Sequence, residues 1–205
     1  MTSQDPDVLP LPALPRLAAP GAGLPPLELQ VSRLLFRAAQ LVSTRVRATA
    51  QLARTRETLQ RLAGKCPEEE GRRRVLIRRL PGMEDSSRYW SVFMTVEHVA
   101  IVTTAVAGIM RELSAGRIPT RTVSTASVKP LEDAGPEALP RLEQACTLVE
   151  EAAALAGPAS ASVRHAHPWF GPLDLPGWHF LAGFHARLHQ RQVASILNQL
   201  PLRVR

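Results

Sequence analysis

The feature that most constrains the fold is a nearly continuous apolar stretch at residues 92–110, VFMTVEHVAIVTTAVAGIM. It is almost long enough to span a bilayer, and a helix that is apolar on every face must be buried in lipid or in a protein core. Glu97 and His98 lie in its first half, and a charged side chain at the bilayer centre costs about 2.5–3.5 kcal/mol. We therefore expect no membrane contact and predict a central helix, starting at the N-cap Ser91, that other helices enclose.

Three further segments carry the three- and four-residue spacing of apolar residues that is typical of amphipathic helices. They cover residues 27–63, 136–156 and 173–200, and glycine or proline follows each of them. The chain is 45% hydrophobic but only 4% aromatic, as expected for a helical core of leucine, valine and alanine. The stripe that we expect the first segment to bury comprises Val31, Leu34, Leu35, Ala38, Leu41, Val42, Val46, Ala53 and Leu59.

Four helices predict an all-α protein with the architecture of a four-helix bundle. The central helix is joined to the next by residues 115–135, whereas an antiparallel neighbour needs only about two to eight connecting residues. A connection of this length can reach roughly 70 Å, enough to return along a helix about 36 Å long. We therefore expect these two helices to be parallel, which gives an up-down-down-up topology.

The N-terminal residues differ in composition from the rest of the chain. Prolines occupy positions 6, 10, 12, 15, 20, 25 and 26, so we predict a disordered segment at 1–26 and the bundle domain at 27–205.

The acidic start lacks the basic region of a signal peptide. Cys66 and Cys146 are far apart and suggest no disulfide framework. We expect a cytoplasmic protein.

The net charge is +7, and the sequence RRRVLIRRL contributes Arg72, Arg73, Arg74, Arg78 and Arg79. Such a cluster can bind a polyanion, or it can be a solvated connection balanced by the preceding glutamates, which we prefer. Some of these arginines could instead bind carboxylates of an anionic cosubstrate. Because no aromatic stacking set, helix-turn-helix pattern or zinc-finger spacing accompanies the cluster, we do not expect nucleic-acid binding.

Three histidines fall on predicted buried stripes. His98 lies on the inward side of the central helix, and His185 and His189 are four residues apart on the last helix, about 40° apart around its axis. A single buried histidine is more often a hydrogen-bonded core residue than a ligand. Three neutral imidazoles from two facing helices, however, can hold one divalent cation such as zinc, nickel, copper or iron, of which we expect zinc or nickel.

Three other residues are candidates for supporting roles around these histidines. Gln192 follows His189 by three residues and can orient a ligand ring through a hydrogen bond. His165 and His167 precede the last helix, and we expect them either to line the open face of the site or to hold the loop.

The motifs RYWSVFMTVEHVAIV and, further on, HPWFGPLDLPGWHFLAGFHARLHQRQV resemble the DinB-like superfamily, also called DinB/YfiT-like, over roughly residues 85–200. The ending H-x-x-x-H-x-x-Q is especially similar to a subgroup of bacterial members. The resemblance implies an up-down-down-up bundle, a divalent metal on His98, His185 and His189, and often a homodimer. It is weak over the first helix and absent over the proline-rich start.

Relatives in this superfamily include metal-dependent transferases and isomerases that use a low-molecular-weight thiol. The resemblance therefore implies an enzyme that transfers such a thiol to a small electrophilic substrate. The alternative is a non-catalytic metal-binding module for stress response or interaction. A third hypothesis, an arginine-mediated nucleic-acid binder, requires steeply salt-dependent binding.

Overall fold

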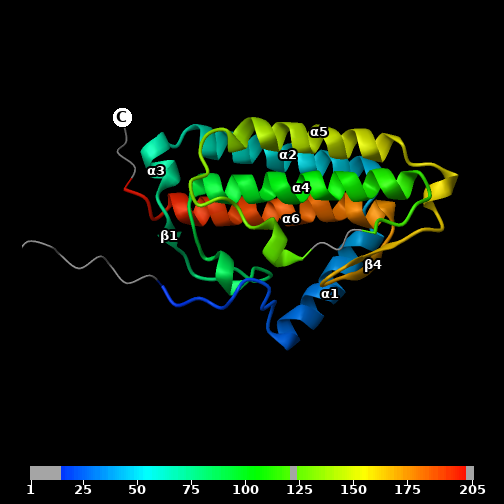
Figure 1. Cartoon of the computed structure of the whole chain (residues 1–205), viewed down its shortest axis with the longest axis horizontal. Coiled ribbons are helices and arrows are strands. Elements are labelled where there is room, and N and C mark those ends of the chain that lie inside the picture. The colour runs from blue at the N-terminus through cyan, green and yellow to red at the C-terminus, as the bar shows by residue number, and fades with distance from the viewer. Residues whose placement is uncertain (1–14, 121–123, 202–205) are drawn as a thin grey trace, which may run out of the picture.

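The computed structural model describes residues 15–120 and 124–201, and most of them lie in helices (Figure 1). Figure 1 shows that two of the four long helices run in one direction and the other two, α4 and α5, in the opposite direction. The predicted all-α, up-down-down-up four-helix bundle is confirmed. The bundle consists of α2 (Arg45–Gly64), α4 (Val92–Ser114), α5 (Ala138–Ala154) and α6 (Leu175–Leu197).

The central helix α4 begins where the sequence predicts. The Ser91 hydroxyl oxygen accepts a hydrogen bond from the Met94 amide at 3.1 Å, the usual N-cap contact. Among the described residues, α4 is the one helix long and apolar enough to cross a membrane by length and composition, and 72% of its most apolar window is buried inside the protein. It packs against α5 and α6, so its apolar surface forms the bundle core.

A long crossover connects the parallel helices α4 and α5 and contains the short helix η2 (Thr125–Val128). The buried carboxylate of Glu97 on α4 holds this crossover. It accepts hydrogen bonds from the Leu131 amide at 2.8 Å and from the Arg141 guanidinium of α5 at 2.7 Å. Although Glu97 adjoins His98 in sequence, its role in the structure is to fix the crossover against the bundle.

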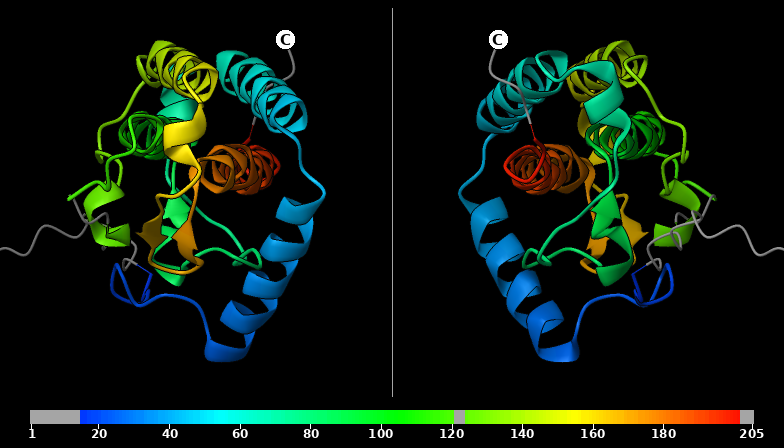
Figure 2. Two further views of the ribbon diagram at one scale, coloured as in Figure 1. Left: turned by 90° about the vertical axis from the view of Figure 1, so that its right-hand side faces the viewer. Right: turned by 90° about the vertical axis from the view of Figure 1, so that its left-hand side faces the viewer.

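The single helix predicted at 27–63 is wrong. The chain forms two helices, α1 (Pro26–Leu41) and α2, because Thr44 caps a new helix by accepting a hydrogen bond from the Arg47 amide at 3.2 Å. Figure 2 shows α1 leaving the bundle and standing beside it.

The stripe predicted to be buried on the first segment is consequently in large part exposed. The face of α1 that contacts the protein carries Phe36, which stacks on Phe170 with centroids 4.1 Å apart, and Glu28, which pairs with Arg79. These contacts turn the aliphatic residues outward. The large residues of this exposed stripe are 47–87% exposed and comprise Leu27, Val31, Leu34, Leu35, Leu41, Val42 and Val46.

Two short antiparallel ribbons, which the sequence did not predict, flank the bundle. One pairs β1 (Val75–Leu76) with β2 (Tyr89–Trp90). The other pairs β3 (His165–His167) with β4 (Gly171–Leu173), immediately before α6. Strands of two or three residues are too short to produce a recognisable alternation. The remaining short helices are α3 (Glu68–Arg72), η1 (Asp85–Ser87) and η3 (Pro158–Ser160).

Part of the N-terminal segment predicted to be disordered, residues 1–14, lies outside the described residues. The described part, before α1, forms no helix or strand but is attached to the loop before β2. The Ala18 amide donates to Asp85 at 2.8 Å, and the amides of Gly21 and Gly23 donate to the buried carboxylate of Glu84 at 3.3 and 3.2 Å. The lead-in therefore packs beside the ordered body of the protein.

Candidate metal centre

The structure brings the three predicted histidines together, His98 from α4 and His185 and His189 from α6. One ring nitrogen of each lies within 4.8 Å of the others, and His98 Nε2 is 3.2 Å from His185 Nε2. Two imidazole nitrogens that ligate one zinc ion at about 2.0–2.1 Å lie roughly 2.9–3.4 Å apart for angles between octahedral and tetrahedral. The spacing of His98 and His185 therefore fits a shared ion.

Hydrogen bonds fix the tautomers of two of these rings. His98 Nδ1 donates to the Val128 carbonyl at 2.7 Å. His189 Nδ1 donates to Gln192 Oε1 at 2.7 Å, and Gln192 Nε2 donates to the Ser87 carbonyl at 2.7 Å, which sets the orientation of the amide. Because each ring carries its proton on Nδ1, Nε2 offers a lone pair. Gln192 therefore forms a hydrogen bond with His189, as the sequence predicts.

His185 lacks the orienting hydrogen bond that the other two rings make. Its Nδ1 is buried and has no hydrogen-bond partner among the described residues. Since His98 Nε2 presents a lone pair, the close approach of His185 Nε2 requires either a proton or a cation between the two nitrogens. The second arrangement uses three neutral imidazoles, an ordinary donor set for zinc or nickel. The residues present thus fit a divalent metal.

All three rings are kept neutral. Burial lowers the pKa of His98 well below its ordinary value, and the neighbouring His189 lowers it further. Burial, followed by the charges of His189 and His98, likewise lowers the pKa of His185 well below its ordinary value. Burial lowers the pKa of His189 to about 4. Because only neutral imidazole can coordinate a metal, the site is in its ligating form at pH 7.

A cavity of about 120 Å³ adjoins the three rings. Its walls are largely apolar and include Val102, Ile109, Phe184 and Leu188. Metal sites with three protein ligands and an open side are typical of catalysis, whereas structural zinc sites are closed by four. The arrangement leaves space for a small molecule beside the histidines.

Lys129 also lines the cavity, and sequence reasoning missed it. Its ammonium donates to the hydroxyls of Ser86 and Ser87 at 2.8 and 3.1 Å and lies 3.8 Å from Glu84. It also lies over the Trp90 ring, 5.0 Å from its centroid. Burial lowers the pKa of Lys129. The sequence offered one sign that Lys129 could matter: the chain has only two lysines among its 25 basic residues.

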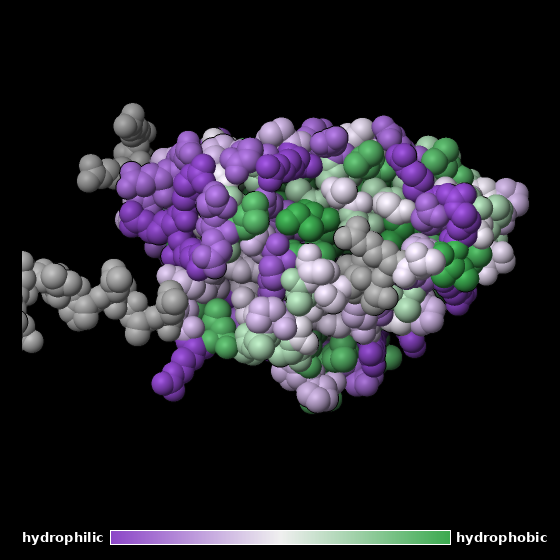
Figure 3. Space-filling view, in the orientation of Figure 1, coloured by the Kyte–Doolittle hydropathy of each residue, from purple (hydrophilic) through white to green (hydrophobic). Residues whose placement is uncertain are grey.

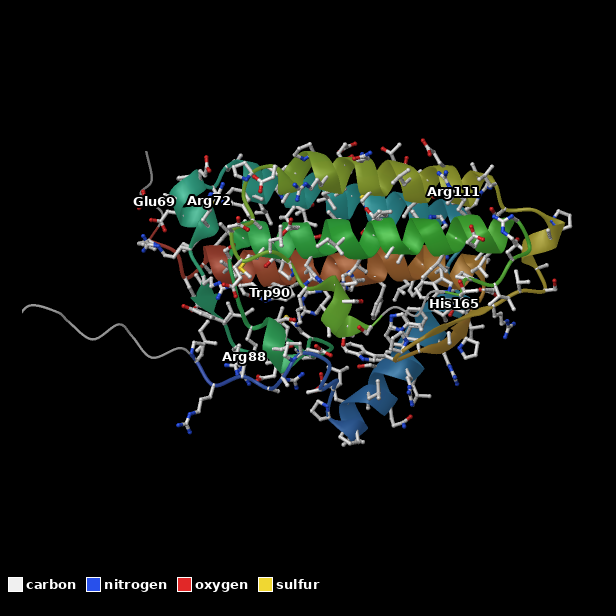
Figure 4. The ribbon with its side chains drawn as sticks, in the orientation of Figure 1. Glu69, Arg72, Arg88, Trp90, Arg111 and His165 are labelled. Carbon is white, nitrogen blue, oxygen red and sulfur yellow. The ribbon has the colours of Figure 1, made fainter. Side chains whose placement is uncertain are left out.

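Of the two histidines expected near the open face, only His167 lines the cavity. His165 does not; its ring stacks on Trp178, with centroids 5.8 Å apart. Trp90 and His165 are both labelled in Figure 4, on the side of the bundle where α1 and the β3–β4 ribbon lie. Burial lowers the pKa of His167 to about 4, so this ring is also neutral at pH 7.

The arginine-rich segment starts with Arg72 at the end of α3 (Figure 4), where hydrophilic residues gather on the face shown in Figure 3, and Arg79 reaches the Met83 carbonyl beside the cavity. Most of its guanidinium groups are paired within the chain. The ion pairs join Arg72 to Glu68, Arg73 to Glu70, Arg74 to Glu132 and Arg79 to Glu28.

Comparison with known proteins agrees with this architecture. The family model of the DinB superfamily matches residues 51–193, a range that contains all three histidines. A crystal structure described as TT2238, a four-helix bundle protein, is 24% identical, with a TM-score of 0.52 over 74% of this chain and 98% of that one. This likeness concerns the fold alone. No curated protein matches the sequence.

Proposed function

The chain belongs to the DinB superfamily, and on that premise we propose that it is a divalent-metal-dependent enzyme whose ion is held by His98, His185 and His189. The observation that carries the proposal is the pair of hydrogen bonds from Nδ1 of His98 and His189. These bonds leave the Nε2 lone pairs free within a cluster of 4.8 Å. An orienting partner on the second ring nitrogen is what metal-bound histidines usually have.

We propose zinc or nickel as the ion, because both bind neutral imidazole well. The reaction that we propose is transfer of a low-molecular-weight thiol to a small electrophile. When bound, the ion would lower the pKa of the thiol and bind the resulting thiolate. The chain itself orients the ligand rings through Val128 and Gln192, and the apolar cavity walls bind the electrophile and exclude water.

Elemental analysis of the purified protein tests the metal. We expect about one divalent ion per chain, lost in each of His98→Ala, His185→Ala and His189→Ala. His165→Ala is the matched control, because its ring lies outside the cavity lining, and it should retain the ion. Equal, very low metal in the parent and all variants contradicts the proposal.

A turnover assay separates the enzyme from the non-catalytic metal-binding module. Zinc- and nickel-loaded protein is incubated with a panel of low-molecular-weight thiols and chromogenic electrophiles, and product formation is followed. If the protein is an enzyme, we expect turnover that depends on the three histidines. Stoichiometric metal without turnover for any pair supports the module instead.

We also propose that the protein is a homodimer that pairs through the exposed stripe of α1. Five of its large aliphatic side chains lie on α1 and are 47–87% exposed, and a contiguous exposed apolar patch marks an interaction surface. A standard interface covers about 800 Å² per partner. A helix of 16 residues is about 24 Å long, so two copies can pair antiparallel about a two-fold axis.

A cytoplasmic location remains a proposal, supported by two free, buried cysteines. The internal ion pairs of the arginine-rich segment make a polyanion a poor candidate partner. We therefore propose no nucleic-acid function.

A further inference from the structure

His167 lines the cavity, and its ring carries a hydrogen-bond donor. Its Nδ1 accepts hydrogen bonds from the backbone amides of Trp169 and Phe170 at 3.1 and 3.3 Å. A neutral imidazole has one acceptor nitrogen and one donor nitrogen. Because both amides require an acceptor at Nδ1, the proton must be on Nε2. No acceptor for this Nε2–H is found among the described residues 15–120 and 124–201.

Trp178 supplies a second donor without a partner. Its indole Nε1 is buried and makes no hydrogen bond within the described part of the chain. Trp178 lines the same cavity as His167, and the two rings are in edge contact with centroids 5.5 Å apart. Indole N–H can only donate, and a buried donor left unpaired is rare in folded proteins and destabilises them. This donor therefore calls for an explanation.

His185 supplies a third hydrogen-bond donor. With its Nε2 directed at His98, its buried Nδ1 is without a partner among the described residues, and it becomes a donor when Nε2 ligates a metal. The wall formed by His167 and Trp178 thus offers donors and no acceptor of its own, beside apolar residues such as Phe184 and Leu181. A ligand group that only accepts hydrogen bonds is its chemical complement.

We infer that the wall formed by His167 and Trp178 binds an acceptor-only oxygen, the carbonyl or carboxylate oxygen of a small organic molecule seated in the cavity. This inference rests on the proposed function, because it names the substrate class of that same cavity. The apolar walls hold the hydrocarbon part of the molecule, and the two ring N–H groups select its oxygen. A hydroxyl or an amine, which brings a proton of its own, is a poorer match.

Nuclear magnetic resonance of ¹⁵N-labelled protein tests the inference directly. The chain has three tryptophans, so the indole N–H of Trp178 can be assigned with Trp178→Phe. The probes share one five-carbon ring: cyclopentanone, cyclopentanecarboxylate and cyclopentylammonium. We expect a saturable downfield shift of the Trp178 indole proton with the ketone, the carboxylate or both, which identifies the oxygen preferred. Cyclopentylammonium should give no such shift.

The variants measure how much the donor contributes. Trp178→Phe removes the N–H together with one ring of the indole, and loss of the hydrogen bond alone should weaken binding of the effective probe about fivefold. The matched control is Trp169→Phe, which removes the same atoms from another cavity tryptophan whose N–H is not a buried unpaired donor, and it should weaken binding less than Trp178→Phe does. The inference is overturned if neither acceptor shifts the Trp178 indole, if the ammonium shifts it equally, or if Trp178→Phe binds as tightly as the parent.

Each titration is performed on chelator-treated and on zinc-loaded protein. The chelated sample excludes direct coordination of the carboxylate to the ion as the cause of binding. If the zinc-loaded protein retains no zinc and its Trp178 indole still shifts with the probe, the proposed zinc site is refuted and this inference stands. If the protein binds stoichiometric zinc but the Trp178 indole shifts in neither sample, the metal site stands and this inference is refuted.

Discussion

Gln192 holds the imidazole of His189 in a single tautomer. The Gln192 amide is fully buried on α6, accepts the Nδ1 proton of His189 at 2.7 Å, and donates at 2.7 Å to the Ser87 carbonyl, in the short helix before β2. The orientation of one histidine therefore depends on a contact between the last helix and a loop more than a hundred residues earlier. The candidate metal centre is thus coupled to the packing of that loop.

Removing this amide should weaken metal binding. We expect Gln192→Leu to lower zinc affinity by about 10–100-fold, because the Nδ1–H of His189 loses its orienting acceptor. Zinc affinity is measured by competition with a chromophoric chelator. Gln192→Glu is the control, since it keeps an acceptor opposite Nδ1 and should retain more of the affinity than the leucine variant. Equal affinities of parent and Gln192→Leu would contradict the assigned role.

The metal-free protein should lose stability as the pH falls from about 6.5 towards 4. The pKa values of His189 and His167 are lowered to about 4 in the folded chain, whereas an unfolded histidine titrates near 6.5. Between these values the unfolded state binds more protons, so the free energy of unfolding rises with pH. Each such group contributes at most about 1.4 kcal/mol per pH unit. Urea unfolding across this range measures the slope.

The variant His189→Leu separates this histidine from the carboxylates that also titrate in acid. Its slope between pH 6.5 and 4.5 should be shallower than that of the parent, because one group with a lowered pKa is gone. A slope as steep as the parent's shows that the ring of His189 is not kept neutral by burial.

Loss of the Glu97 carboxylate should loosen the crossover that holds the Val128 carbonyl against His98. We expect Glu97→Leu to lower the free energy of unfolding by about 1–3 kcal/mol, because the Leu131 amide loses its acceptor and Arg141 its partner. Thermal and urea denaturation measure the change. Glu143→Leu is the control, since the pair with Arg56 is partly exposed and should contribute less than about 1 kcal/mol.

Charge on the exposed stripe of α1 should dissociate the proposed dimer. We expect the double variant Leu34→Glu, Leu35→Glu to sediment as a monomer with unchanged helix content, because both side chains are exposed within one chain. Ile118→Glu, equally exposed but beyond α4, should remain dimeric. Sedimentation velocity distinguishes the states, and a parent that is monomeric at all accessible concentrations refutes the dimer.

Local periodicity was sufficient for several features. The nearly continuous apolar character of residues 92–110 predicts a largely buried helix, and Ser91 marks its start because a hydroxyl there can satisfy a free amide. The spacing of His185 and His189 places both rings on one side of any α-helix. The length of the crossover indicated parallel neighbours. These conclusions depend on geometry within one segment or on chain reach, which sequence contains.

What only the tertiary structure decided is which partner each face meets. The aliphatic spacing of residues 27–46 continues across the break at Thr44, so sequence alone could not show that α1 leaves the bundle and turns this stripe outward. The Val128 carbonyl and Lys129 reach the site from a crossover that carries no motif. Helical periodicity sets the angle of a side chain around its own axis, whereas the neighbour at that angle is set by packing between distant parts of the chain.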